Sequence, residues 1–276
     1  MTGTSPKSRG HLNPGDPRVA FDRFALPREF DALVRHVWVV RWHVPIGEEA
    51  AQRVLAYPAF NAVLETSSHQ ERPDQIRGLA LYPPTGRVAV RRLYGEGAAV
   101  GVLLRPCAGR VLLEGSGVLP SAVPVQGLPL TDAHGIETAL TSASRDRVRD
   151  ALVDWLRPHA GLVGERDRLV NEACRLAEED ASLERAADLA AAIGVTPRTL
   201  ERTVREYLGL SPKWLIECRR LQAAATTLYT EPHTDLSELA AQLGFADYAH
   251  FSRRYRSVLG ETPAQTRNAG RSRATA

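Results

Sequence analysis

A motif that occurs twice near the C-terminus constrains the fold of this chain more than any other feature. The first copy contains, in order, Leu189, Ala190, Gly194, Leu200, Arg202, Val204, Gly209 and Pro212. The second copy contains Leu239, Ala240, Gly244, Phe251, Arg253, Tyr255, Gly260 and Pro263. The copies are offset by 50 residues before the turn and by 51 after it, so the second copy carries one extra residue in its turn. We interpret this pattern as a duplicated structural unit.

The first copy predicts a helix, a tight turn and a second helix. Ser182 is a candidate N-cap, and apolar residues recur at helical spacing over 183–193. Gly194 suits the end of this helix. Thr196 can cap the next helix and Pro197 fits its first turn, where a missing N–H costs nothing.

The second copy repeats this logic. Asp235 and Glu238 have the spacing of a capping box at the start of its first helix. Gly244 ends that helix, and Asp247 caps a second helix over 248–259. The repeat therefore predicts two helix-turn-helix units.

A helix, a short glycine-containing turn and a second helix form the unit that places its second helix in the major groove of DNA. Helical hairpins also occur in ordinary bundles, so the charge pattern matters. The stretches that hold the first helices, 166–195 and 221–247, have net charges of −3 and −4, whereas 196–220 and 248–276 have +3 and +5. This sorting favours contact between the second helices and nucleic acid. The alternative is that these arginines only solvate exposed faces.

Five short motifs in this region carry a family resemblance. They are Gly-Val-Thr-Pro-Arg-Thr-Leu-Glu-Arg at 194–202, Gly-Leu-Ser-Pro at 209–212, Arg220-Leu221 with Ala224, Gly-Phe-Ala-Asp-Tyr-Ala-His-Phe-Ser-Arg at 244–253, and Gly-Glu-Thr-Pro at 260–263. Together they resemble the C-terminal domain of AraC/XylS-type bacterial transcription regulators over about 166–268. The resemblance implies two helix-turn-helix units joined by one linker helix, with both recognition helices in successive major grooves. A linker over 212–229 would span roughly 27 Å, against about 34 Å between successive major-groove faces.

The resemblance assigns roles to residues of both second helices. The candidates for reading bases are Arg198, Glu201, Arg202, Tyr248, Ala249, His250 and Arg253. Arginine can hold guanine, glutamate can accept from cytosine, and histidine can donate to a base edge or a phosphate. Glu201 has the alternative of pairing with Arg198 or Arg205 on its own helix. The candidates for phosphate contact, which set affinity and register, are Arg205, Lys213, Arg254 and Arg256.

Apolar and aromatic positions of the same helices are expected in the core instead. They are Leu200, Val204, Tyr207, Phe251, Tyr255 and Leu259. Their helical spacing places them opposite the arginines.

The N-terminal half predicts a small β-rich domain. Residues 1–17 are rich in Gly, Pro, Ser and charge, and they predict a disordered tail. Six branched or aromatic runs between turn signals predict a small antiparallel sheet or barrel, at 36–44, 53–57, 61–66, 76–82, 88–94 and 98–104. Helical patterns follow at 109–113, 144–156 and 167–177. The expected order is a sensor, a helical connector and a DNA reader.

In the resembling family, N-terminal domains bind an effector, dimerise, or both, often with a cupin-like barrel. An unidentified small molecule could bind near the aromatic residues Trp38, Trp42, Tyr57, Phe60, Tyr82 and Tyr94, although aromatic residues in strands commonly belong to the core. His36, His43 and His69 lack the close spacing of a metal-binding cupin, so no metal is expected. The connector helix with Trp155 fits either a homodimer seam or an intramolecular brace.

Composition agrees with a two-domain regulator. With 276 residues, 43% of them hydrophobic, the chain can bury two modest cores. The sequence shows no signal peptide and no long apolar run, so we expect a cytoplasmic protein that does not span a membrane. Cys107, Cys174 and Cys218 are far apart and suit reduced thiols, with Cys107 left open as a redox sensor.

These observations predict an α+β protein with five parts. They are a disordered tail at 1–17, a β-rich sensor at 18–132, a helical connector at 133–165, a DNA-binding domain at 166–268 and a tail at 269–276. The predicted function is sequence-specific binding of double-stranded promoter DNA to regulate transcription, without catalytic residues or a cofactor, and with RNA polymerase as a candidate partner.

Two alternatives stay open. One is an enzyme whose N-terminal barrel acts on DNA that the C-terminal units deliver, and the other is a module whose helical pairs bind protein. The enzyme would need a reactive cysteine in a cysteine-rich or Pro-Cys-His context, which this sequence lacks.

Overall fold

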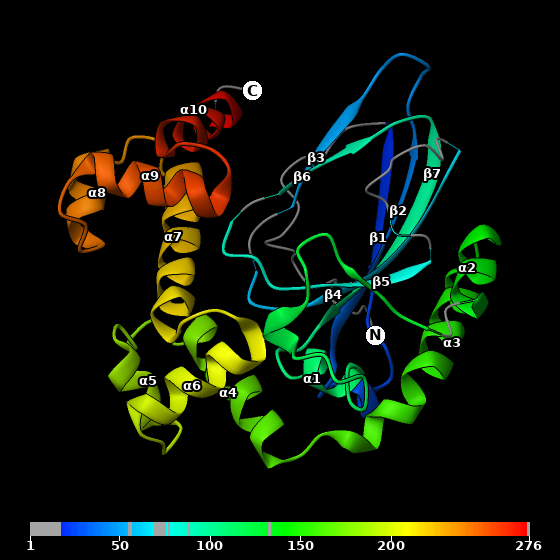
Figure 1. The fold of residues 1–276 in the computed structure, drawn as a ribbon. Helices are drawn as coiled ribbons and strands as arrows, with labels where there is room; N and C mark the ends of the chain where they lie inside the picture. The colour runs from blue at the N-terminus through cyan, green and yellow to red at the C-terminus, as the bar shows by residue number, and fades with distance from the viewer. Residues whose placement is uncertain are drawn as a thin grey trace.

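An antiparallel β domain is followed by helices that lead to two helical units at the C-terminus (Figure 1). The computed structural model describes residues 18–54, 57–68, 76, 78–87, 89–131 and 134–274. The predicted tail at 1–17 and His69 lie outside these residues. Within the described ranges, no helix is both long and apolar enough to cross a membrane. The α+β class predicted from the sequence is confirmed.

The β domain contains a six-stranded sheet and a separate pair of strands. The sheet has the order β1 (Val19–Phe24), β2 (Val34–His43), β7 (Glu96–Leu104), β4 (Asn61–Ser67), β5 (Leu79–Tyr82) and β8 (Leu128–Pro129), and the pair is β3 (Ala50–Val54) with β6 (Ala89–Leu93). All these pairings are antiparallel. The six predicted runs overlap strands β2 to β7, whereas the sequence does not predict β1 or β8.

Strand β2 is buried on both faces, which explains its nearly unbroken apolar run. Val39 faces the main core on one side. On the other side, Val40 and Trp42 pack with Ala50 of β3 and Leu93 of β6. The β3–β6 pair therefore covers one face of β2.

Two glycines of β7 allow tryptophan rings to lie directly against the sheet. A Cβ atom at Gly97 would lie 2.1 Å from Cζ2 of Trp42, and one at Gly101 would lie 2.0 Å from Cζ2 of Trp38. No side chain fits at such separations. Both indoles are thus held by packing, in agreement with the expectation that strand aromatics belong to the core.

The connecting region is helical, as predicted, and contains one α-helix more than the sequence indicates, besides short 3-10 helices. It comprises η1 (Arg28–Phe30) before β2, and then α1 (Ala108–Leu112), η2 (Pro120–Ala122), α2 (His134–Thr141), α3 (Arg145–Leu156), η3 (Arg157–Leu162) and α4 (Glu165–Glu179). Helices α1, α3 and α4 correspond to the three predicted patterns. Helix α2 is the addition.

The two C-terminal units have the predicted helices. They comprise α5 (Ala186–Ala192), α6 (Pro197–Leu208), α7 (Pro212–Thr230), α8 (Leu236–Gln242), α9 (Tyr248–Leu259) and α10 (Pro263–Ala274). Figure 1 shows α7 as a strut with α5 and α6 at one end and α8 and α9 at the other. Helix α10 continues to Ala274 and so extends into the tail that the sequence predicts at 269–276.

Three of the predicted helix caps form. Thr196 and Asp247 each accept a hydrogen bond from the backbone N–H three residues later, at 3.2 and 2.6 Å. Asp235 does the same at 2.8 Å. The Glu238 side chain bonds Gln242 at 3.3 Å instead of closing the predicted capping box.

The predicted N-cap Ser182 is wrong. Its backbone N–H and its hydroxyl both donate to Asp180, at 2.9 and 2.6 Å, and this local turn delays the helix. Helix α5 begins at Ala186, where Asp188 accepts from the N–H of Arg185 at 3.1 Å.

The first helical unit shares its hydrophobic core with the β domain, whereas the second unit has its own. One continuous cluster contains Val102 of β7, Val170 of α4 and Leu200 of α6. A separate cluster contains Phe251 and Tyr255 of α9 with residues of α7 and α8. The sequence divides the chain at 166, but in the structure the side chains around that position belong to one core.

Candidate nucleic-acid interface

One side of α6 carries a stripe of exposed arginines. Arg198, Arg202 and Arg205 are spaced by four and three residues, so they lie on one face of the helix, and all three are exposed. The opposite face is buried and consists of Leu200, Thr203, Val204, Tyr207 and Leu208. The helix thus separates a packing face from a basic face that points to solvent.

Glu201 forms one of the two pairings left open by the sequence. Its Oε1 accepts from Nε of Arg205 at 2.6 Å. Both side chains are largely exposed, so this pair contributes little to stability. The contact orients Arg205 beside Arg202 on the same helix face.

Helix α9 carries the matching basic stripe. The offset of 51 residues maps Arg253 onto Arg202 and Arg256 onto Arg205, and both are exposed. Ala249, which maps onto Arg198, is also exposed. The stripe of α9 therefore has two arginines and a small residue where α6 has three arginines.

The start of α9 adds two aromatic side chains to this surface. His250 is exposed and meets Phe245 edge-on, with 5.3 Å between ring centroids. Tyr248 is half-buried and packs against the core of the second unit, 6.3 Å from the ring of Phe251. His250 is consequently the more accessible of the two predicted base readers.

Arg254 does not lie with the other predicted phosphate contacts. Its Nε and Nη2 donate to the two carboxylate oxygens of Glu217 in α7, at 2.6 and 2.7 Å. The 51-residue offset maps Arg254 onto Thr203, which is 2% exposed and lies on the packing face of α6. In the structure this side chain joins α9 to α7, and its contact with phosphate stays a prediction.

Lys213 lies in the first turn of α7 and is exposed. Ser211 caps this helix by accepting from the N–H of Trp214 at 3.2 Å. The 19 residues of α7 give a strut of about 28 Å, which agrees with the linker expected from the sequence.

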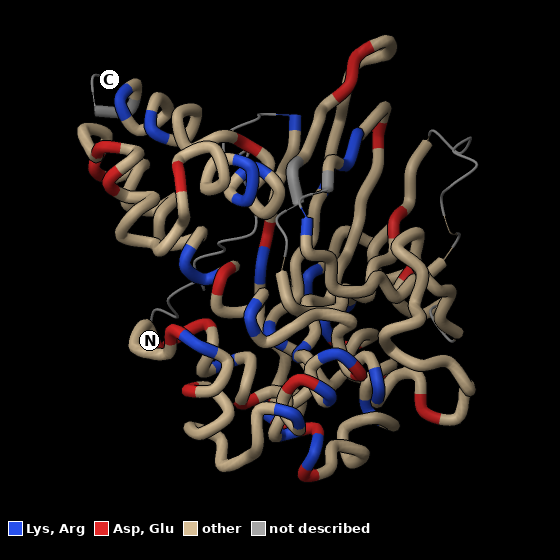
Figure 2. The backbone as a smooth tube through the Cα atoms, turned by 60° about the vertical axis from the view of Figure 1, so that its left-hand side comes forward, with Lys and Arg blue, Asp and Glu red and all other residues tan. Residues whose placement is uncertain are grey.

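Charge is distributed between helices as the sequence indicates. Two acidic residues lie at the start of α8, the N-cap Asp235 and Glu238 in the first turn, whereas α10 carries arginine as its only charged residue type. Figure 2 shows the acidic positions of α8 apart from the basic stretches of α9 and α10. The basic surface is thus concentrated on the second helix of the unit and the helix that follows it.

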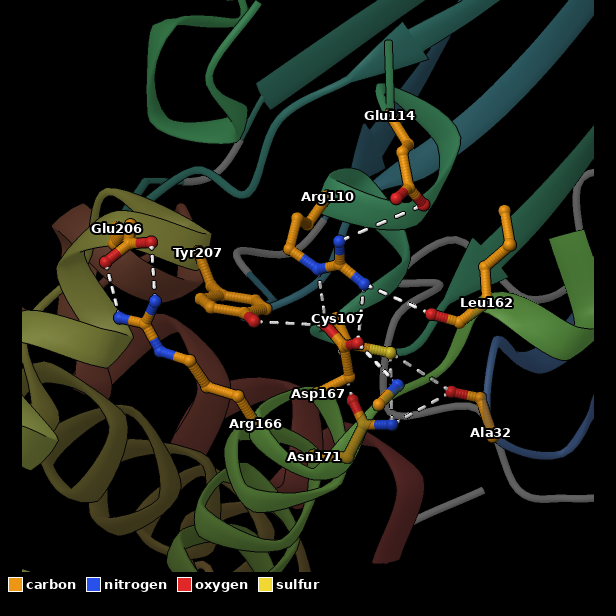
Figure 3. A network of polar contacts seen from close by, with 11 residues as sticks. Ala32, Cys107, Arg110, Glu114, Leu162, Arg166, Asp167, Asn171, Glu206 and Tyr207 are labelled. Carbon is orange, nitrogen blue, oxygen red and sulfur yellow. Dashed lines mark hydrogen bonds and ion pairs between the residues drawn. The ribbon is translucent and has the colours of Figure 1, made fainter.

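A buried carboxylate joins the β domain to the first helical unit (Figure 3). Asp167 of α4 is 2% exposed and accepts from Nε and Nη2 of Arg110 in α1, at 2.7 and 2.6 Å. It also accepts from the hydroxyl of Tyr207 in α6 at 3.1 Å and from the N–H of Gly164 at 2.8 Å. Burial alone would raise the pKa of Asp167, but these bonds, led by that of Arg110, hold the pKa below its ordinary value.

Asn171, one turn further along α4, reinforces this junction. Its Oδ1 accepts from the N–H of Cys107 at 3.0 Å, and its Nδ2 donates to the carbonyl of Ala32 at 2.8 Å. Figure 3 shows Asn171 beside Cys107 and Ala32. Helix α4 is thereby bonded to α1, to α6 and to the segment before β2.

All three thiols are buried, and none of them forms a disulfide bond. Burial raises the pKa of Cys107 and of Cys218 to about 12, and it raises the pKa of Cys174 as well. A thiol that stays protonated near neutral pH is a poor nucleophile. These environments therefore do not favour the redox-sensor interpretation of Cys107.

The predicted effector residues of the β domain divide into two groups. Trp42 and Phe60 are buried in hydrophobic clusters. The other four are half-buried, and two of them bond carboxylates: the hydroxyl of Tyr57 donates to Glu178 at 2.6 Å, and that of Tyr94 to Glu49 at 2.9 Å.

The histidines of this domain are not gathered at one place. His36 is 8% exposed, and burial followed by nearby arginines lowers its pKa to about 4. His43 is exposed and bonds Glu96 at 2.6 Å. In the part of the chain that the structure describes, no group of three or more His, Cys, Asp or Glu side chains is placed to hold a metal ion.

The helical units match a known family. Residues 189–269 match the model of a helix-turn-helix domain. A solved AraC-type transcriptional regulator from Chromobacterium violaceum is 30% identical, and the match covers 37% of this chain and 92% of that one, with a TM-score of 0.33. The C-terminal helical region belongs to the AraC/XylS family.

Two curated relatives match part of this chain. The transcriptional activator NphR of a Rhodococcus species is 30% identical over 136 residues, which are 48% of this chain and 39% of NphR. The XylDLEGF operon transcriptional activator 2 of Pseudomonas putida is 33% identical over 88 residues, 31% of this chain and 54% of that protein. The chain thus spans less than two thirds of either relative. Its residues 23–117 match a domain of unknown function (DUF6597).

Two groups of residues that hold the helices together are not predicted from the sequence. One is the Arg110–Asp167–Tyr207 junction, and the other comprises the charged residues of α7, Glu217, Arg219 and Arg220. The predicted core positions Leu200, Val204, Tyr207, Phe251, Tyr255 and Leu259 are all buried, as expected. The 51-residue offset could have indicated the role of Glu217, because it maps its partner Arg254 onto Thr203 of the packing face of α6.

Proposed function

We propose that this chain is a sequence-specific DNA-binding regulator that acts on promoter DNA through both helix-turn-helix units. The observation that supports this function most directly is the pair of exposed arginine stripes at equivalent positions of α6 and α9. Each stripe lies opposite a buried face, so each helix can enter a groove without unpacking. Bases are read by Arg198, Glu201, Arg202, Tyr248, Ala249, His250 and Arg253, and phosphates are contacted by Arg205, Lys213 and Arg256.

This function places the protein in the bacterial cytoplasm, where promoter DNA lies. It requires no catalytic step and no cofactor. RNA polymerase is the partner through which a bound regulator would change transcription.

Selection of bound fragments from random and genomic DNA tests the function. We expect two short sequence boxes about one helical turn apart. Binding of the selected site should be about 10³-fold or more tighter than binding of random DNA and should weaken steeply with salt. Failure to enrich any sequence, with the folded full-length protein, would contradict the proposal.

Substitutions separate base reading from phosphate contact. Arg202→Ala and Arg253→Ala should each cost about 1–3 kcal/mol on the selected site and relax preference at one box, because a base contact is lost. Lys213→Ala should instead weaken selected and random DNA alike and lower the salt slope by about one. Equal losses on selected and random DNA for the two arginine variants would show that they do not read bases.

The N-terminal domain responds to an effector, and Gln52 marks where that effector binds. Gln52 of β3 is 6% exposed, and neither the oxygen nor the nitrogen of its amide has a hydrogen-bond partner among the residues that the structure describes. Alternation along β3 places it on the face of Ala50, which packs with Trp42 and Leu93. Each unsatisfied buried polar group costs about 1–3 kcal/mol. A small molecule that presents one donor and one acceptor would satisfy both.

Replacing Gln52 by leucine tests this assignment. Without any ligand, Gln52→Leu should raise the free energy of unfolding by about 1–2 kcal/mol, because the unsatisfied amide is removed at similar volume. Chemical denaturation measures the change. A decrease in stability would show that the amide has a partner in the unliganded protein and would argue against an effector site there.

A further inference from the structure

The linker helix α7 holds both helical units through two adjacent arginines. Arg219 is 9% exposed and points to the first unit, where it donates to the backbone carbonyls of Asp180 and, at 3.0 Å, Leu183. Arg220 points to the second unit and donates from Nη2 to the carbonyl of Leu243 at 2.5 Å. Leu243 is the C-cap of α8, directly before the turn of the second helix-turn-helix unit.

The anchor of Arg220 reaches into that turn. A Cβ atom at Gly244 would lie 3.4 Å from Nη2 of Arg220. Gly244 has a φ of 71°, which glycine adopts without strain. The guanidinium thus bonds the point at which the chain leaves α8 and turns toward α9.

Arg219 anchors the first unit at a comparable point. Asp180 is the C-cap of α4, and Leu183 lies between α4 and α5. The last carbonyls of a helix lack intrahelical partners and carry partial negative charge, so a guanidinium suits this position. Burial, followed by the nearby charge of Arg220, lowers the pKa of Arg219.

Glu217 of α7 fixes the recognition helix of the second unit in the same region. Its carboxylate forms the bidentate pair with Arg254 of α9, at 2.6 and 2.7 Å. Such a pair constrains orientation as well as distance. Within residues 217–220 of α7, Glu217 thus contacts α9, Arg219 contacts the end of α4, and Arg220 contacts the end of α8.

We propose that Arg219 and Arg220 are positioning residues that set the separation and the rotational phase of α6 and α9, and thereby the spacing between operator boxes that the protein accepts. The proposal rests on the proposed function, because it concerns how two DNA-reading helices are placed. Adding one base pair between the boxes rotates one box about the DNA axis by roughly 34°. A linker anchored at both ends cannot follow this rotation without breaking a contact or deforming the DNA.

Lysine is the informative replacement at both positions. It keeps the positive charge, but its three donors are on one nitrogen, so it cannot reach the two carbonyls from two separate nitrogens as Arg219 does. At position 220, lysine would place a compact ammonium where the broader guanidinium of Arg220 now reaches the carbonyl of Leu243. Charge-dependent attraction to DNA is thereby retained while the anchor is weakened.

The experiment measures binding to operators in which only the spacing changes. Starting from the operator selected with the wild-type protein, the boxes are moved by −1, +1 and +2 base pairs. We expect wild-type affinity to fall about 10-fold or more for each altered spacing. For Arg219→Lys and Arg220→Lys, we expect the penalty to shrink to about 3-fold or less, while affinity for a single isolated box stays within about 2-fold of wild type.

Arg271→Lys provides the matched control. Arg271 of α10 also donates to a backbone carbonyl, that of Pro232 at 3.1 Å, but both groups lie in the second half of the DNA-binding region. This variant should keep the wild-type spacing profile. Thermal unfolding of all variants shows whether each is folded, and either α7 variant alone suffices for the comparison.

Two results would overturn the proposal. One is a wild-type spacing profile in folded Arg219→Lys or Arg220→Lys protein. The other is an equal loss of single-box binding in these variants, which would indicate a general structural role. Failure to select any operator with the wild-type protein would instead contradict the proposed function.

Discussion

Replacing Asp167 with asparagine should lower the free energy of unfolding by about 3 kcal/mol at neutral pH. Removal of one member of a buried ion pair typically costs about 3–5 kcal/mol, because the partner is left uncompensated. We expect the lower end of this range of energies, because the Arg110 side chain is one third exposed and water can solvate it, whereas that of Asp167 is 3% exposed. Denaturant-induced unfolding of the variant and the wild type measures the difference.

The pH dependence of this difference identifies its origin. The folded-state pKa of Asp167 is below its ordinary value, so its contribution to stability is present above that ordinary value. It is lost as the pH falls through the lower folded-state pKa. The stability gap between wild type and Asp167→Asn should therefore be full near pH 7 and should shrink as the pH falls below about 4.

Tyr207→Phe is the matched control for this experiment. It removes only the hydroxyl that bonds Asp167 at 3.1 Å, and we expect a loss of about 1 kcal/mol. A loss below about 1 kcal/mol for Asp167→Asn itself, or a gap that does not change with pH, would show that the carboxylate does not hold the junction.

Phe251→Ala should destabilise the second helical unit by about 3–5 kcal/mol, the usual cost of removing a large buried ring. Phe251 is fully buried in a cluster that contains residues of α7, α8 and α9 but none of the β domain. The loss should therefore be confined to α8–α10. Amide hydrogen exchange should show reduced protection in these helices and unchanged protection in β2, β7 and α4.

Leu200→Ala provides the comparison, because Leu200 maps onto Phe251 in the first unit. Leu200 is fully buried in the cluster shared with the β domain. Its truncation should weaken the β domain and the first unit together, by about 2–5 kcal/mol. Uniform loss of protection across the chain in both variants would contradict the division into two cores.

Local signals explain why the C-terminal helices are predictable. Thr196, Asp235 and Asp247 cap helices as their positions suggest, and Gly209 and Gly260 end α6 and α9 in the left-handed conformation. Each of these features depends on a few neighbouring residues. The repeat then places the basic stripes on equivalent faces.

The parts that the sequence does not predict depend on distant contacts. Strand β1 contains Asp22 and Arg23 and is largely exposed, so it lacks the alternation of a half-buried strand. Strand β8 has only two residues. Both are strands because β2 and β5 supply their hydrogen bonds.

The sequence also does not predict which side chains far apart along the chain form a pair. Glu217 and Arg254 are 37 residues apart, and Arg110 and Asp167 are 57 apart. A charged residue shows its type in the sequence, but its partner is fixed only by packing. For this reason the sequence does not predict that Arg254 bonds Glu217.

The most direct test of this account is a base-by-base protection experiment on the selected operator with the wild-type protein and with Arg202→Ala and Arg253→Ala. We predict two protected major-groove boxes on one face of the DNA, about one helical turn apart. Arg202→Ala should lose protection in one box and Arg253→Ala in the other. A single protected box, or loss of the same box in both variants, would contradict the claim that both helical units read DNA.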